Sequence, residues 1–200
     1  ALEALAEQVA VLLLVGAVSY LSLTRMSENG ESVTHTHQVL EHLTSLGSLM
    51  KDAETGQRGF TITGNPAYLD PYEGAVRDIP IALKELRALV ADSPSQQARL
   101  DRAEPLISAK LSGLAETIEV RRTEGGEAAA ARVGSGEGRQ TMESLRQVLG
   151  DMDSEERRLL KERSDNVEAI TTTAKYTIIG GTLLCLLLIT GAGFLLTNSL

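Results

Sequence analysis

Three histidines lie close together in the sequence, and histidine is the side chain that most readily exchanges a proton near neutral pH. His35 and His37 are two residues apart, so on a helix they do not share a face, and these two alone do not make a metal site. His42 instead falls between leucines that face other helices. Counting residues along the expected helices places it level with Glu156, which predicts a His42–Glu156 pair that titrates near neutral pH. A purely structural histidine stays the alternative.

A second candidate site lies in the polar stretch DAETGQRGFTITGNPAYLDPY, residues 52–72. Glu54 and Arg58 are four residues apart, the spacing of an ion pair on a helix. One interpretation is a tight packing site, because small residues let helices approach closely, with a local ion pair. The other is a surface for a ligand or partner protein at one end of the helices, where an arginine would suit an anionic group. Its expected members are Glu54, Thr55, Gln57, Arg58 and, from a later helix, Arg146.

Motifs for catalysis are missing from the sequence. The glycine-rich GSGEG, residues 134–138, lacks the Lys-Ser/Thr and the preceding strand of a phosphate-binding loop. No catalytic triad, metalloprotease motif or kinase motif is present, and the single Cys185 makes neither a disulfide framework nor a cysteine metal cluster. The net charge of −8 argues against nucleic-acid binding. We therefore expect no enzyme activity, no metal and no cofactor in this segment.

Apolar residues recur at steps of three and four along most of the chain, which predicts helices. Turn residues divide this pattern, and the expected helices run over residues 27–63, 66–90, 93–125 and 127–133, and from 139 onward. The first and last long helices have nearly equal lengths, and short connections favour antiparallel neighbours. We expect an all-α, antiparallel, up-down-up-down four-helix bundle whose two outer helices continue into transmembrane helices.

The two ends of the chain differ from its middle in charge. All 19 Lys and Arg lie between Arg25 and Lys175, whereas residues 5–24 and 176–197 are apolar and long enough to span a membrane. The sequence therefore predicts a transmembrane helix over 5–24, a helical domain over 25–175 and a second transmembrane helix over 176–197. The alternative for the first segment, whose start carries Glu7, is a signal peptide. The alternative for the second, a buried core helix, fits so long an uncharged run poorly. The charges do not orient the two spans, because Arg25 and Lys175 both lie on the domain side.

The polar stretch also carries a family resemblance. DAETGQRGF, residues 52–60, followed by the TG-NP-YL-PY pattern of residues 63–72, resembles the signature of the third CHASE family, the cyclase- and histidine-kinase-associated sensory extracellular domains. The similarity continues through residues 136–163. It implies a four-helix sensory bundle outside the cytoplasm, between two transmembrane helices. It also implies an output module after the second span, most often a histidine kinase and less often a nucleotide cyclase or chemoreceptor.

These observations predict the sensory input module of a bacterial receptor in the inner (plasma) membrane, part of a longer chain that is a two-component histidine kinase. The expected partners are membrane lipid, a second copy of the chain in a homodimer, and an unidentified small ligand or partner protein. The alternatives are the input domain of a chemoreceptor or nucleotide cyclase, and a membrane-anchored structural bundle that transmits no signal.

Overall fold

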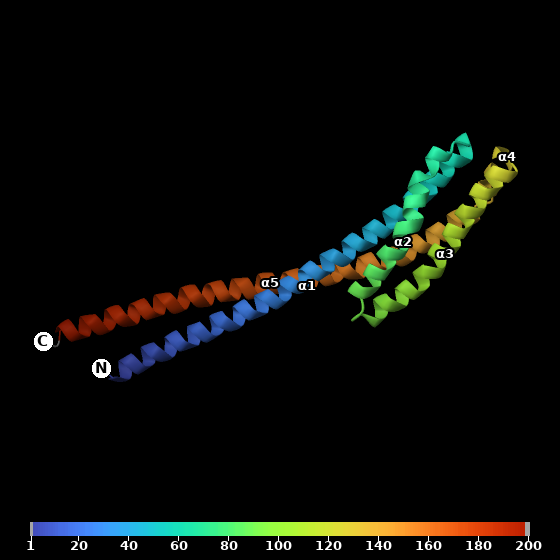
Figure 1. Cartoon of the computed structure of the whole chain (residues 1–200). Coiled ribbons are helices and arrows are strands. Elements are labelled where there is room, and N and C mark those ends of the chain that lie inside the picture. The colour runs from blue at the N-terminus through green and yellow to red at the C-terminus, as the bar shows by residue number, and fades with distance from the viewer. Residues whose placement is uncertain (1, 199–200) are drawn as a thin grey trace. The chain divides into compact units, whose positions relative to one another are not determined.

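The chain folds as helices joined by short turns (Figure 1). The structure is a computed structural model that describes residues 2–198; it leaves undescribed the side chains of residues 2–9, 11, 12, 14, 22, 23, 25–29, 188 and 192–198. Its elements are α1 (Leu2–Thr63), the 3₁₀ turn η1 (Pro66–Leu69), α2 (Asp70–Leu89), α3 (Pro94–Thr123), α4 (Gly126–Gly134) and α5 (Glu137–Asn198). No strand occurs among these residues, which confirms the all-α prediction.

The helices end where the turn residues predict. Gly64, after α1, has a φ of 67°, a left-handed conformation that glycine adopts at little cost. The Asn65 side chain accepts a hydrogen bond from the Ala67 backbone nitrogen at 3.1 Å, and Pro66 occupies the first turn of η1. Pro94 likewise begins α3. The expected start of the last helix at residue 139 is two residues late, because α5 begins at Glu137.

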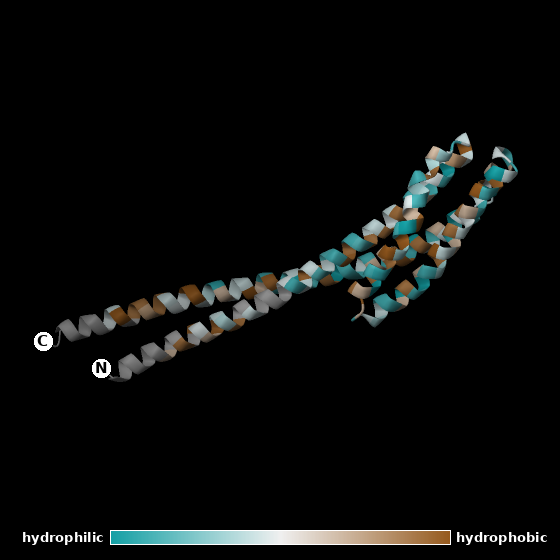
Figure 2. Ribbon diagram, in the orientation of Figure 1, coloured by the Kyte–Doolittle hydropathy of each residue, from teal (hydrophilic) through white to brown (hydrophobic). Residues whose placement is uncertain are grey.

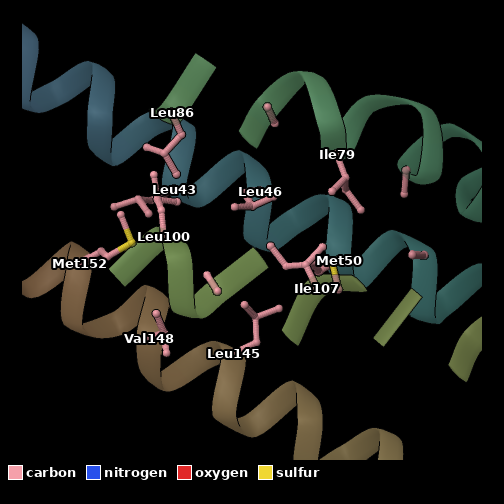
Figure 3. Packing of buried hydrophobic residues seen from close by; sticks show 14 of the residues in the cluster. Leu43, Leu46, Met50, Ile79, Leu86, Leu100, Ile107, Leu145, Val148 and Met152 are labelled. Carbon is pink, nitrogen blue, oxygen red and sulfur yellow. The ribbon is translucent and has the colours of Figure 1, made fainter. Parts of the chain in front are cut away.

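The chain divides into two compact units, residues 35–159 and residues 1–34 with 160–200, and each is described separately. The first unit contains one hydrophobic core to which α1, α2, α3 and α5 all contribute (Figure 3). Its fully buried members include Leu46 and Met50 from α1, Leu86 from α2, Leu100 and Ile107 from α3, and Leu145 and Met152 from α5. Burial of each such side chain stabilises the fold by roughly 1.5–3 kcal/mol, so the core that these four helices share is a main source of the stability of this unit.

Contacts between side chains fix the direction of each helix in this bundle. They show α2 antiparallel to α1, α3 parallel to α1, and α5 antiparallel to α3. The pairs that show this are Gly56–Tyr72, His42–Glu85 and His35–Leu89 for α1 and α2, Glu54–Lys110 and Thr61–Arg121 for α1 and α3, and Lys110–Gly138 and Gln96–Met152 for α3 and α5. The expected up-down-up-down topology is therefore present in residues 35–159.

The second unit pairs the first half of α1 with the second half of α5. Arg163 Nη1 donates a hydrogen bond to the Ser32 carbonyl at 3.0 Å, and a Cβ placed on Gly181 would meet the Val15 side chain. Because residue numbers rise on one helix as they fall on the other, the two helices run antiparallel. Cys185 is buried in this unit.

One helix among the described residues, α5 within residues 137–191, is long and apolar enough to cross a membrane by length and composition. Apolar residues are frequent in the coloured part of its ribbon nearest the C-terminus (Figure 2). Many of them are exposed, including Leu183, Leu187 and Ile189. The predicted span over 5–24 falls partly on residues whose side chains lie outside the described set.

Candidate functional site

Two glycines explain part of the unusual composition of residues 52–72. A Cβ on Gly56 would lie 2.8 Å from the Tyr72 backbone nitrogen and 3.1 Å from the Tyr68 carbonyl oxygen. A Cβ on Gly59 would lie 2.7 Å from the Tyr68 ring. The distances of 2.8 Å and 2.7 Å are shorter than real Cβ contacts, so glycine at these two positions lets η1 and the start of α2 pack this closely against α1. The packing interpretation of the stretch therefore holds at these two positions.

The C-terminal end of α3 contacts the end of α1 and η1. Phe60, Leu69 and Ile118 bury one another in a small apolar cluster. Arg122 lies over the Phe60 ring, 5.8 Å from its centre, which is within range of a cation–π interaction. Arg121 Nε donates to the Thr61 carbonyl at 2.9 Å. The turn after α1 is thus held by apolar and polar contacts from α3.

Glu54 is the centre of a charged cluster that joins three helices. Its carboxylate lies 2.6 Å from Arg58 Nη2, which confirms the predicted ion pair on α1, and 3.3 Å from Lys110 Nζ on α3. Lys110 Nζ also donates to the Gly138 carbonyl in the first turn of α5, at 2.9 Å. The Lys110 side chain is only 4% exposed, and a buried ammonium is tolerated because both contacts compensate its lost hydration.

This cluster borders a cavity of about 330 Å³ between α1, α3, the end of α4 and the start of α5. The volume falls within the range typical of small-molecule sites. Seven charged side chains line it: Glu54, Arg58, Lys110, Glu116, Arg132, Glu137 and Arg139. Glu116 pairs with Arg132 across α3 and α4. Arg139, exposed at the rim, forms no ion pair among the described residues.

The cavity includes part of the predicted ligand surface. Glu54, Gln57 and Arg58 line it, but Thr55 and Arg146 do not. Arg146 is exposed and lies 3.5 Å from Glu143 on its own helix. Gln57 is buried, and its amide nitrogen donates to Thr61 Oγ1 at 2.6 Å. The structure therefore groups three of the five predicted residues and separates Arg146 from them; their role stays a prediction.

Sequence reasoning did not identify several residues that line the cavity, among them Lys110, Thr117, Arg132 and Arg139. One signal was available for Lys110. It stands three residues after Ile107 and four before Leu114, both of which are buried, so it occupies a core position of the apolar pattern in α3. A charged residue at such a position needs partners inside the bundle. The residues of α4 carried no comparable signal.

The predicted pair of His42 and Glu156 is wrong. His42 Nδ1 lies 3.6 Å from Glu85 Oε2 on α2, whereas Glu156 is buried and accepts a 2.7 Å hydrogen bond from Gln96 Nε2 on α3. Counting residues along the helices places His42 level with Glu156, but an equal distance along the bundle does not decide which neighbouring helix a side chain faces. His35 Nε2 donates to the Leu89 carbonyl at 2.8 Å, and His37 is exposed.

Comparison with known proteins agrees with this architecture. The crystal structure of the Rhodopseudomonas palustris histidine kinase HK9 sensor domain is similar at a TM-score of 0.58 and 26% identity, over 63% of this chain and 98% of that one. No curated protein matches. The family model of the CHASE3 domain matches residues 29–166, well over half of the sequence. The resemblance noted in residues 52–72 is therefore confirmed, and the chain belongs to the CHASE3 domain family.

Proposed function

We propose that this chain is the extracytoplasmic input module of a bacterial transmembrane sensor histidine kinase, and that α5 carries the stimulus across the membrane to the kinase. The CHASE3 match and the similarity to a histidine kinase sensor domain support a sensory input role. In this proposal residues 5–24 and 176–197 both span the membrane and two copies of the chain form a homodimer. The kinase lies in the part of the receptor that follows α5.

The observation that carries the proposal is the continuity of α5. This helix is unbroken from Glu137 to Asn198. Its first part supplies Met142, Leu145, Val148 and Met152 to the bundle core, and its last part is the apolar segment suited to a bilayer. A single helix thus joins the bundle core to the apolar segment, and in this proposal a displacement of the core residues is passed along it.

Polar contacts give α5 a defined starting position in the bundle. Gln96 Nε2 donates to the Met152 carbonyl at 3.3 Å as well as to Glu156, and Lys110 donates to Gly138. Each contact connects α5 to α3. Shifts of about 1–2 Å at packed helices are enough to switch such interfaces, so a stimulus that exchanges these contacts for others would shift α5.

A chimeric receptor tests the proposal. Residues 1–200 are joined to the output half of a histidine kinase of known activity, and autophosphorylation is measured in membrane vesicles. A flexible Gly-Gly-Ser insertion between Lys175 and Tyr176 interrupts α5. We therefore expect the autophosphorylation rate of this variant to stay constant when stimuli are added on the side of the bundle. The same insertion in the turn between α2 and α3, after Asp92, is the matched control and leaves regulation intact.

Three outcomes contradict the proposal. Regulation that survives the insertion in α5 would show that α5 does not transmit the stimulus. A long heptad hairpin or a cyclase domain after α5 in the complete gene would assign the module to a chemoreceptor or a nucleotide cyclase. The absence of any response in every chimera, with the kinase half itself active, would favour a structural bundle.

A further inference from the structure

The cavity beside Lys110 has the features of a ligand site. We propose that it binds a small organic carboxylate, held by Lys110 and Arg139, and that Lys110 links its occupancy to the first turn of α5. The binding part stands on the geometry of the cavity alone. The link to signalling rests on the function proposed above.

Lys110 supplies a buried donor at the cavity wall. An ammonium group has three N–H donors. One of them is used by the Gly138 carbonyl and a second faces Glu54. The remaining donor is available to a ligand, and the low exposure of this side chain makes a charge-assisted hydrogen bond to it stronger than one at the surface.

The charges around the cavity favour a monoanion. Its lining holds four basic and three acidic side chains. Glu54 balances one of its two cationic neighbours, Glu116 balances Arg132, and the third acidic residue, Glu137, offsets one more positive charge. One excess positive charge remains, which a single carboxylate would neutralise. A second carboxylate would add an unbalanced negative charge, and a cation would meet the excess positive charge.

The size and the walls of the cavity favour an organic molecule over an inorganic ion. A water molecule takes up about 30 Å³ in the liquid, so a cavity of about 330 Å³ leaves most of its space empty around a lone oxyanion. Leu114 and Val133 supply apolar surface to the same wall, and Thr117 and Thr141 supply hydroxyl groups. This mixture suits a short carbon skeleton with one anionic end.

The contact of Lys110 with Gly138 connects the cavity to α5. A carboxylate that binds the remaining donor draws Lys110 Nζ toward itself and so lengthens its hydrogen bond to the Gly138 carbonyl. Gly138 lies in the first turn of α5, so the ligand would loosen or reset the contact that holds this turn against α3. Arg139 is the next residue on α5 and would bind the same carboxylate from the helix itself.

Isothermal titration calorimetry on the full chain in lipid nanodiscs tests the binding. The probes are propionate and benzoate, each matched with its neutral amide, and inorganic phosphate. We expect at least one of the two carboxylates to bind, its amide to bind at least about tenfold more weakly, and phosphate to bind more weakly than the carboxylate, because the amide and phosphate lack either the charge or the carbon skeleton.

Three variants place the binding in the cavity. Arg139→Gln removes an exposed charge without an ion pair and should weaken carboxylate binding by about tenfold. Gly113→Leu adds a side chain at a residue that lines the cavity. A Cβ there meets no atom within 4 Å, so we expect the position to accept a side chain and binding to be lost, with circular dichroism as the check on folding. Lys110→Met should also abolish binding, and the Gly113 variant keeps the test valid if Lys110→Met does not fold. Arg102→Gln, an exposed change elsewhere on α3, is the control and leaves binding unchanged.

The proposal is overturned if neither carboxylate binds, if the amides bind as well as the acids, or if Gly113→Leu binds as the wild type does. Stronger binding of phosphate would assign the cavity to an inorganic anion instead. These outcomes are separate from those of the chimeric receptor. Carboxylate binding without any change in kinase activity would contradict the signalling role alone, and regulation without carboxylate binding would contradict this inference alone.

Discussion

Gly56 leaves room for the backbone of Tyr72, and this single position tests how tightly α1 and α2 pack. We predict that Gly56→Ala lowers the free energy of unfolding by about 1–3 kcal/mol, because its Cβ would lie 2.8 Å from the Tyr72 nitrogen and the backbone must move. Urea unfolding followed by circular dichroism measures the change.

The matched control is Gly47→Ala on the same helix. A Cβ at Gly47 meets no atom within 4 Å, so alanine there should raise stability by about 0.5–1 kcal/mol through its higher helix propensity. If both substitutions stabilise the protein, the close approach at Gly56 does not exist in solution.

Tyr72 makes the free energy of unfolding depend on pH in the alkaline range. Burial raises the pKa of its hydroxyl above the usual value of about 10, Arg122 lowers it and Glu73 raises it. Folding therefore favours the neutral phenol. The stabilising contribution is present below the pKa of the unfolded chain and is lost as pH rises through the folded pKa. We predict that Tyr72→Phe removes this part of the alkaline loss, measured as urea midpoints at pH 8 and above pH 10.

Tyr68→Phe is the control for this pH effect. The Tyr68 side chain is about half exposed, so this variant removes a phenol hydroxyl from the same region without opening a buried site. An identical pH profile for Tyr72→Phe and the wild type would show that the Tyr72 hydroxyl is hydrated in solution.

The interaction partners of some residues could be predicted from the sequence, and those of others could not. The Glu54–Arg58 pair follows from their spacing on one helix, because both partners share a rigid local geometry. The partner of His42 does not, since it depends on the rotation of α1 relative to two different neighbours. Lys110 is a charged residue at a core position of the apolar pattern in α3. Its partners, Glu54 and Gly138, lie on other helices and could not be predicted from the sequence around it.

At the scale of helices, Gln96 and Glu156 connect α3 to α5 inside the bundle. Both side chains are buried, and the carboxylate accepts its 2.7 Å hydrogen bond from the amide. We predict that Gln96→Ala costs about 2 kcal/mol or more, because it leaves a buried carboxylate without this donor. Glu156→Gln keeps the shape and an acceptor oxygen and should cost less than about 1 kcal/mol.

Thermal unfolding of the two variants beside the wild type measures the difference. If both substitutions lowered the stability equally, replacing the Glu156 carboxylate by an amide would cost as much as removing its hydrogen-bond donor. A negligible effect of Gln96→Ala would mean that water replaces the amide at this position.

The helices themselves were predicted closely from the sequence, because their ends depend on local residues. Asn65-Pro66 and Ser93-Pro94 fix two turns, and the number of residues between turns fixes helix lengths. The up-down-up-down order followed from the short connections. The wall that α4 contributes to the cavity did not follow, because a helix of nine residues can lie in several ways against α3 after the turn at Gly125.

At the scale of the whole molecule, the proposed function predicts a membrane topology that labelling can test. Thr55 is exposed on α1, within residues 35–159. We predict that Thr55→Cys reacts in intact cells with a maleimide that does not cross membranes, because the proposed function places the bundle outside the cytoplasm. Cys185 is the internal control: it should stay unlabelled, since it lies buried in the apolar segment of α5.

Labelling of Thr55→Cys only after the membrane is permeabilised would place the bundle in the cytoplasm and contradict the proposed orientation. Labelling of Cys185 in intact cells would contradict the assignment of residues 176–197 to the bilayer. The same Cys variant tests the proposed homodimer, because cross-linking of the detergent-solubilised chain should give a band at twice the monomer mass.

The distribution of the core along the sequence has a consequence for synthesis. The core begins with Val39 on α1 and is completed by Met152 on α5. At a translation rate of about 5–20 residues per second, roughly 6–23 seconds pass between these two residues. α2 and α3 are completed within this interval, and until α5 has emerged the core faces of the helices already made lack their fourth partner. The apolar side chains of the core therefore cannot be fully buried before the last quarter of the chain is synthesised.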